Sequence, residues 1–138
     1  MNNILSHTSV FRVRYADTDK MGIVYNGNYF AFFETGRTEL MRHFGLPYTL
    51  VEESGFMLPL VDAYVKYLSP ARYDDKLEIK AEIKLEQKAV IEFKYNIKCG
   101  NTPIAQGYTR HVFIKQGNMK TVRPPKFFLD IFNFKGTK

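Results

Sequence analysis

The sequence of 138 residues has no tryptophan, a single cysteine (Cys99), and no apolar run long enough to cross a membrane. One cysteine excludes an intrachain disulfide and a multi-cysteine zinc site. The first residues show neither the basic start nor the apolar stretch of a signal peptide. We therefore expect a cytoplasmic protein without a transmembrane segment. The 12 phenylalanines and 9 tyrosines predict a core rich in aromatic rings.

Charge is distributed unevenly along the chain, whose formal net charge is +6. Residues 1–69 carry 6 basic and 7 acidic side chains, whereas residues 70–138 carry 14 and 7, so the second half is +7. Such a field attracts a polyanion, for example nucleic acid, an anionic membrane or a phosphorylated small molecule. Many of these lysines alternate with glutamates, which is also typical of a solvated strand face. Charge alone does not select a partner.

The spacing of apolar residues predicts a strand followed by a long helix. Apolar and basic residues alternate between Ser9 and Tyr15, as in a half-buried strand. Farther along, apolar positions recur at spacings of three and four, which predicts one buried face of a helix. Asn28 is the expected N-cap of this helix and Gly45 its expected stop. The predicted buried face consists of Tyr29, Phe32, Phe33, Gly36, Leu40 and Phe44.

The second half of the chain is predicted to form strands. From Leu77 to Leu85, apolar and charged residues alternate without exception, which places the apolar residues on one face of a strand. Similar patterns at 91–99 and 104–115 follow after short turns, so the sheet should be antiparallel. The long helix must then cover one face of this sheet. We expect an α+β fold, with a curved sheet around one helix, and a single domain spanning residues 1–138.

The densest group of unusual residues lies between the first strand and the long helix, from Asp17 to Tyr29. A carboxylate at this position would lie near the backbone N–H groups of a helix N-terminus, which can polarise a carbonyl. A base beside such donors suits acyl transfer. The structural interpretation is that aspartates are common in turns and helix caps. Spacing alone favours the structural interpretation.

The motifs around this segment resemble the signature of the 4-hydroxybenzoyl-CoA thioesterase family of hot-dog folds, and in particular its Tol–Pal-associated branch of short acyl-CoA thioesterases. The matching residues are 14–19 (RYADTD), 22–25 (GIVY), 28–29, 33–34, 36–39, Tyr67, 70–72 and 74–75. The resemblance extends over most of the chain, from about Phe11 to Arg123. It implies a hot-dog fold, in which an antiparallel sheet wraps a long helix, and hydrolysis of an acyl-CoA thioester to a carboxylic acid and free coenzyme A.

The resemblance assigns catalysis to Asp19, as nucleophile on the thioester or as general base for the attacking water. It also implies that Tyr25 and Asn26 bind the substrate, with the backbone N–H of Asn26 donating to the thioester carbonyl. Many members of the branch have histidine where this chain has Asn26, and an asparagine side chain cannot transfer a proton as imidazole can. No metal and no redox cofactor is implied.

Several alternatives stay open at this point. The acyl group could be short and aliphatic or aromatic, and an acyl carrier protein could replace coenzyme A. The resemblance implies a homo-oligomer, dimer or tetramer, with the acyl site at a subunit interface. A non-catalytic module that binds acyl thioesters, or tethers partners at an anionic membrane, is the competing class. We expect no specific nucleic-acid binding, since the aromatic residues mostly follow the core phase of the predicted elements.

Overall fold

The computed structural model describes residues 3–86 and 88–133. Within these residues no helix is long and apolar enough to span a membrane. In chain order the elements are β1 (Ile4–Arg12), η1 (Tyr15–Asp17), α1 (Asn28–His43), α2 (Tyr48–Glu53), β2 (Phe56–Met57), β3 (Leu60–Tyr67), β4 (Lys76–Lys84), β5 (Val90–Cys99), β6 (Thr102–Lys115), β7 (Thr121–Val122), α3 (Lys126–Leu129) and η2 (Asp130–Asn133).

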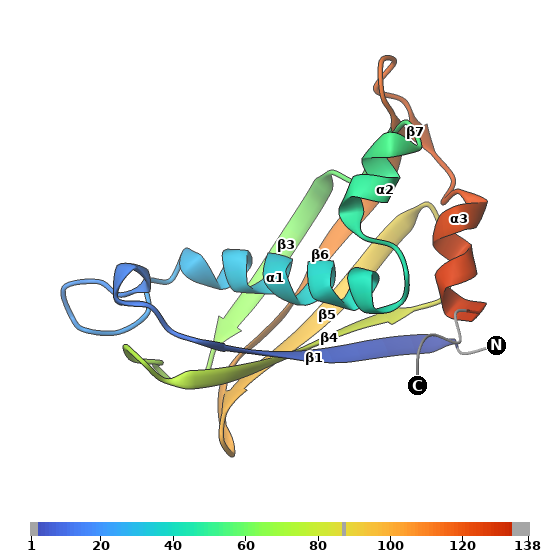
Figure 1. The fold of residues 1–138 in the computed structure, drawn as a ribbon. Helices are drawn as coiled ribbons and strands as arrows, with labels where there is room; N and C mark the ends of the chain where they lie inside the picture. Colours follow the sequence, from blue (N-terminus) through green and yellow to red (C-terminus); the bar gives the residue numbers. More distant parts are fainter. Residues whose placement is uncertain (1–2, 87, 134–138) are drawn as a thin grey trace.

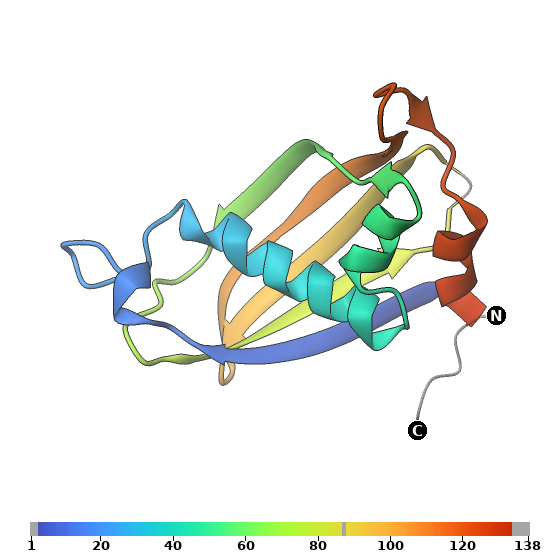
Figure 2. The ribbon, with the colours of Figure 1, turned by 45° about the horizontal axis from the view of Figure 1, so that its top comes forward.

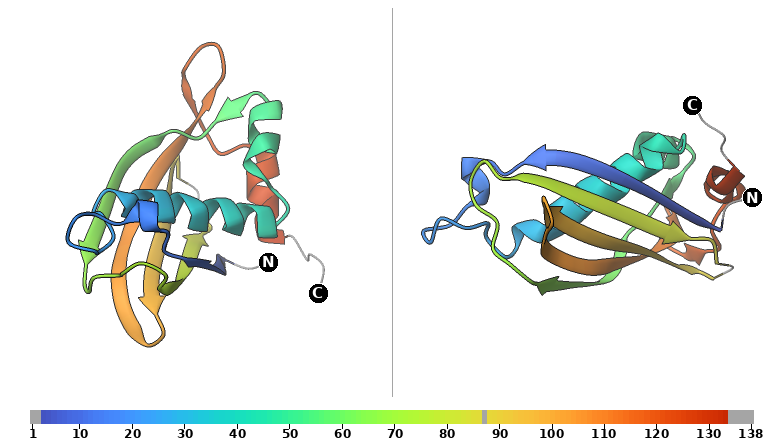
Figure 3. Two further views of the ribbon diagram at one scale, coloured as in Figure 1. Left: turned by 60° about the vertical axis from the view of Figure 1, so that its left-hand side comes forward. Right: turned by 90° about the horizontal axis from the view of Figure 1, so that it is seen from below.

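One antiparallel sheet forms the body of the molecule. Its strands follow the order β1-β4-β5-β6, with β3 beside β6 along the opposite edge and the short β2 and β7 paired with the end of β6. The sheet curves around α1, which lies across its concave face (Figures 1 and 3). The α+β hot-dog architecture expected from the sequence is confirmed.

Helix α1 is held to the sheet by its aromatic face. The ring of Phe33 is fully buried and stacks on Tyr95 of β5, with 4.3 Å between ring centroids. Gly36 lets the helix approach β4 closely, because a Cβ there would lie 2.9 Å from a methyl group of Ile79. The predicted face is correct except at its end, where Met41 is buried and Phe44 is only half-buried.

Two predicted boundaries near the first strand are wrong. β1 begins at Ile4 and ends at Arg12, whereas the prediction was Ser9 to Tyr15. The residues after β1 leave the extended conformation because η1 forms there, with the Asp17 N–H donating to the Arg14 carbonyl at 2.9 Å. Gly27 rather than Asn28 is the N-cap of α1. The predicted stop is confirmed, since Gly45 follows the helix with a φ of +89°.

The edge strand β3 is more exposed than its apolar sequence suggests. Leu60, Val61 and Tyr64 are each about half exposed, because β3 has only β6 as a neighbour among the described strands. β6 approaches β3 closely at Gly107, where a Cβ would lie 2.0 Å from the Tyr64 carbonyl oxygen. The expectation that aromatic residues mostly follow the core phase holds, because most phenylalanines and tyrosines in the described part of the chain are buried or half-buried. The exposed aromatic residues are Tyr15, Tyr25, Phe30, Tyr64, Tyr67 and Tyr73.

Candidate functional site

The loop between η1 and α1 carries Asp19, Tyr25 and Asn26, the three residues to which the family resemblance assigns a catalytic or binding role. It lies at one end of the molecule, opposite α2 and α3 (Figure 2). Within the loop, Thr18 and Val24 form an isolated antiparallel bridge, and Ile23 forms another with Arg72. Gly22 has a φ of +79°, a conformation that glycine adopts without strain and that lets the chain reverse here. The loop is therefore an ordered hairpin rather than a loose connection.

Asp19 lies at the start of this hairpin and is half-buried. Its backbone N–H donates to the Ile23 carbonyl at 2.9 Å, and its Oδ1 accepts the Met21 N–H at 2.8 Å. The second carboxylate oxygen makes no hydrogen bond to the described residues. Asp19 lines a hollow of about 540 Å³ together with Tyr15 and Tyr73. The turn thus orients one oxygen and leaves the other able to react.

Asn26 lies two residues before α1, at the positive end of the helix dipole. Its carbonyl accepts the hydroxyl of Tyr67 at 3.0 Å and the Tyr29 N–H at 3.4 Å. Its own N–H, like that of Gly27, donates to no group in the described part of the chain. Two such donors at a helix start can hold a carbonyl oxygen on which negative charge develops.

Tyr25 is placed by its backbone, whereas its ring is 58% exposed. The Tyr25 N–H donates to the Asp17 carbonyl, and its own carbonyl accepts the Asn28 N–H, both at 2.9 Å. The ring lies over Gly27, because a Cβ at Gly27 would come within 2.9 Å of it. The exposed ring leaves a face available to a ligand or to a second subunit.

In the single chain, the catalytic candidate and the carbonyl-binding candidate lie in separate cavities. Asn26 lines a cavity of about 210 Å³ with Tyr29 and Tyr67, and Asp19 is not part of it. Both cavities border the same hairpin, because Gly22 lines the Asp19 cavity and Ile23 lines the Asn26 cavity. One chain therefore supplies both groups without enclosing them in one pocket.

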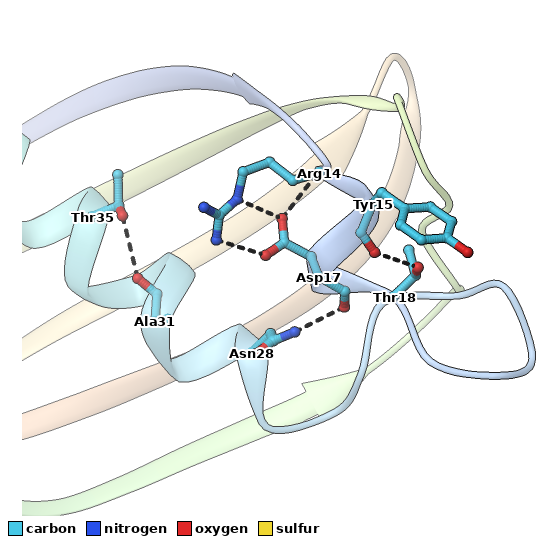
Figure 4. A network of polar contacts seen from close by, with 7 residues as sticks. All are labelled: Arg14, Tyr15, Asp17, Thr18, Asn28, Ala31 and Thr35. Atoms are coloured by element: carbon cyan, nitrogen blue, oxygen red, sulfur yellow. Dashed lines mark hydrogen bonds and ion pairs between the residues drawn. The ribbon is translucent and has the colours of Figure 1, made fainter.

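Asp17 makes hydrogen bonds that hold the start of this region together, a role that its place in the sequence did not reveal (Figure 4). Its buried carboxylate accepts the Arg14 backbone N–H at 2.9 Å and the Arg14 guanidinium at 3.0 Å. Its carbonyl accepts the side-chain amide of Asn28, the first residue of α1, at 2.8 Å. Asp17 thereby joins the end of β1, the loop and α1, so the structural interpretation holds for the first acid of the Asp-Thr-Asp run.

A buried polar chain lies beneath α1, on the concave face of the sheet. The His111 Nδ1 lies 3.2 Å from the Leu58 carbonyl and its Nε2 lies 2.9 Å from the Thr109 hydroxyl, which is 2.6 Å from the Tyr95 hydroxyl. Since a carbonyl can only accept, Nδ1 carries the proton, Thr109 donates to Nε2, and Tyr95 donates to Thr109. Burial lowers the pKa of His111, and the nearby Arg37 charge lowers it further, to about 4.

The other histidines and the cysteine do not build a metal centre. His7 and His43 stack with 4.4 Å between ring centroids, and Cys99 is half-buried at the end of β5. Within residues 3–86 and 88–133, no three histidine, cysteine, aspartate or glutamate side chains gather as a metal would require.

A curved antiparallel sheet wrapped around one long helix is the hot-dog architecture, which is found in thioester hydrolases. Comparison with known proteins agrees with this class. Residues 13–132 match the family described as the thioesterase-like superfamily, and the chain belongs to that superfamily. The expected family and enzyme class are thereby confirmed.

Individual relatives cover nearly the whole chain. The chain is 36% identical over 129 residues to the acyl-CoA thioester hydrolase YbgC of Escherichia coli, covering 91% of this chain and 94% of YbgC. The crystal structure of a DHNA-CoA thioesterase from Staphylococcus aureus is similar with a TM-score of 0.84 and 29% identity, covering 91% of this chain and 85% of that one. A structure from Aquifex aeolicus has a TM-score of 0.86 and 32% identity, with 91% and 98% coverage.

Proposed function

We propose that this protein hydrolyses an acyl-CoA thioester to a carboxylic acid and free coenzyme A. The observation that carries the proposal is that one short loop holds both the half-free carboxylate of Asp19 and the uncommitted N–H groups of Asn26 and Gly27. The similarity to YbgC, which is named an acyl-CoA thioester hydrolase, supports the substrate class.

In this mechanism the Asn26 N–H donates to the thioester carbonyl oxygen. The donor strengthens as that oxygen becomes negative, and one such donor contributes about 2.7–4 kcal/mol to transition-state stabilisation. Asp19 either attacks the carbonyl carbon or accepts a proton from the attacking water. In the nucleophilic route, loss of the thiolate leaves a mixed anhydride between the acyl group and Asp19, and water then hydrolyses it and frees Asp19; in the general-base route, water attacks the thioester carbon directly. In both routes the carbon–sulfur bond breaks, coenzyme A leaves as the thiol after protonation, and water supplies the oxygen that is added.

We further propose that the working enzyme is a homo-oligomer, a dimer or tetramer, in which a second copy closes the acyl site. Two features support this assembly. Asp19 and Asn26 line separate cavities in one chain, so a further surface is needed to enclose a thioester between them. The β3 edge also presents exposed apolar side chains at Leu60 and Val61, and such an edge is a ready site for pairing with another chain. Light scattering coupled to gel filtration measures the assembly directly.

The experiment that tests the function measures release of free thiol from a panel of acyl-CoAs, from short aliphatic to aromatic, together with an acyl carrier protein loaded with the same groups. Wild type is compared with Asp19→Asn and with the matched control Asp130→Asn, whose carboxylate pairs with Lys126 far along the chain. We expect turnover in wild type and in the control, and a loss of at least about a hundredfold in Asp19→Asn.

Two results would contradict the proposal in different ways. Equal turnover in wild type and Asp19→Asn would remove Asp19 from the mechanism. Binding of acyl-CoA by folded wild type without any thiol release would favour the competing class, a module that binds acyl thioesters without hydrolysing them.

A further inference from the structure

A further cavity, with both polar and apolar side chains in its lining, opens on the second half of α1, beyond the proposed catalytic loop. Its volume is about 310 Å³. It lies between the second half of α1, the first residue of α2 and the segment that leads into β3. Its lining residues are Glu34, Arg37, Thr38, Met41, Tyr48 and Leu58. None of these residues takes part in the proposed hydrolysis.

Three of the six residues that line this cavity carry side-chain hydrogen-bond donors, namely Arg37, Thr38 and Tyr48. Arg37 is half-buried, and no carboxylate of the described residues lies within ion-pair distance of its guanidinium. The Tyr48 hydroxyl accepts the Leu58 N–H at 3.1 Å, while its own proton meets no acceptor in the described chain. The Thr38 hydroxyl likewise makes no bond to the described residues. One acid, Glu34, contributes to the lining, and it is exposed to solvent. The group that complements several unused donors is an acceptor, above all a carboxylate.

The groups packed behind Arg37 are held in place by hydrogen bonds and carry no negative charge that could neutralise its guanidinium. Leu58 is held on both sides, its carbonyl by His111 and its N–H by Tyr48. Burial raises the pKa of Tyr95, and the nearby Arg37 charge partly offsets the rise. The imidazole of His111 is neutral for the reasons given above. Arg37 therefore lies beside uncharged groups. Its guanidinium is within hydrogen-bonding reach of the Tyr95 hydroxyl, but no described carboxylate neutralises its positive charge, which can still attract an anionic ligand.

The cavity is on the same side of α1 as Asn26. Arg37 lies nine residues after Asn28, the first residue of α1, which corresponds to about two and a half helical turns and a rise of roughly 14 Å. Side chains of a helix lean toward its N-terminus, so the Arg37 guanidinium shortens this gap. β3 runs along the same side, since Tyr67 at its end lines the Asn26 cavity and Leu58 just before it lines the Arg37 cavity.

These observations, taken with the proposed function on which the inference rests, lead to a substrate class. We propose that the Arg37 cavity binds the distal carboxylate of a dicarboxylic acyl group whose thioester end lies at Asn26. An acyl chain of medium length then extends along the side of α1 that faces β3. Arg37 is a specificity-determining residue in this arrangement and takes no part in breaking the thioester bond.

The test compares substrates of equal length that differ only at the far end. Octanoyl-CoA is compared with octanedioyl-CoA, and decanoyl-CoA with decanedioyl-CoA, using kcat/KM from thiol release. The variants are Arg37→Gln and Glu34→Gln, with Arg42→Gln as the matched control, because Arg42 is an exposed α1 arginine that pairs with Glu39. Thermal unfolding confirms that each variant is folded before its kinetics are compared.

We expect wild type to prefer the dicarboxylic substrates, and Arg37→Gln to lower that preference at least about tenfold, mainly through KM. The Glu34→Gln variant should raise the preference a few-fold, because it removes the one negative side chain of the cavity. The control should leave it unchanged. An unchanged preference in folded Arg37→Gln overturns the inference, as does an equal loss on both classes of substrate, which would indicate a purely structural role.

Equilibrium binding of the same thioesters to Asp19→Asn separates this inference from the proposed function. Weaker binding of octanedioyl-CoA after Arg37→Gln is added, without a change for octanoyl-CoA, supports the carboxylate site whether or not wild type shows turnover. If adding Arg37→Gln to Asp19→Asn changes the binding of neither thioester, the carboxylate site is overturned, even if wild type hydrolyses both.

Discussion

Acidification is expected to destabilise this protein through His111, the buried imidazole of β6. The ring is fully buried and its pKa is lowered to about 4, from an ordinary value of 6.5, by burial and by the charge of Arg37. Above pH 6.5 the imidazole is neutral in both the folded and the unfolded chain. As the pH falls below 6.5, the unfolded chain binds a proton that the folded chain does not bind until about pH 4. The free energy of unfolding therefore falls across this window.

The magnitude follows from the two pKa values. Each pKa unit corresponds to about 1.4 kcal/mol, so the complete window amounts to about 3 kcal/mol. Between pH 7 and pH 5 the expected loss from His111 is about 2 kcal/mol, a large share of the ~5–15 kcal/mol by which domains are typically stable. His7 contributes in the same direction, since burial and the neighbouring His43 lower its pKa and Glu39 only partly offsets this shift.

Urea unfolding followed by circular dichroism at pH 7, 6 and 5 measures the effect, with wild type and His111→Gln compared at each pH. The variant should be less stable at pH 7 because it breaks the chain from Tyr95 to Leu58, but it should lose about 2 kcal/mol less than wild type between pH 7 and pH 5. The difference between the two proteins removes the contributions of His7 and the carboxylates. Parallel pH profiles, or an NMR titration of the His111 ring near pH 6.5, would refute the reasoning.

Four substitutions test how the fold positions the site, each by chemical or thermal unfolding. Gly107→Ala should destabilise the protein by roughly 3 kcal/mol or more, because the new Cβ would lie 2.0 Å from a β3 carbonyl oxygen; a near-native stability would contradict the packing. Gly36→Ala should change stability by less than about 1 kcal/mol, since the gain in helix propensity offsets the displacement of the Ile79 methyl group. Asp17→Asn should cost about 1–3 kcal/mol because an amide cannot accept both bonds from Arg14, whereas Asp19→Asn should leave the unfolding midpoint nearly unchanged. Equal effects of these two aspartate substitutions on stability would show that the two acids do not have separate roles.

Local patterns predicted most of the secondary structure. The alternation from Leu77 to Leu85 corresponds to β4, in which the odd-numbered residues from Leu77 to Ile83 are buried. The spacing of three and four after Tyr29 corresponds to α1, and Gly45 ends the helix as expected. These predictions succeed because the period of apolar residues directly reflects which face of an element is buried.

The features that the sequence did not predict depend on contacts between segments far apart in the sequence. β3 reads as an apolar strand, and only its place at the sheet edge explains why Leu60 and Val61 are exposed. Asn28 reads as a helix cap, but its amide bonds to the Asp17 carbonyl eleven residues earlier. A cap or an exposed edge cannot be recognised from composition when the competing partner comes from tertiary packing.

For the candidate site, too, the sequence predicted the local arrangement but not the contacts made by tertiary packing. The Asp-Thr-Asp motif placed Asp19, Tyr25 and Asn26 in one short loop before a helix, and the structure has them there. It could not show that Asp19 and Asn26 line different cavities, or that Asp17 is the structural acid of the pair. Arg37 was missed altogether, because an arginine three residues after Glu34 looks like half of an ordinary intrahelical ion pair, which the structure does not contain.

The sequence by itself determined the α+β class, the long helix, the antiparallel strands and the loop that holds the proposed catalytic acid, because each depends on residues close together in the chain. Only the tertiary structure decided which polar groups meet. The chain from Tyr95 through Thr109 and His111 to Leu58 connects three segments, and the Arg37 cavity forms where α1, α2 and the start of β3 converge. Such groups are brought together by burial of the apolar faces around them, so their chemistry appears only once the core is packed.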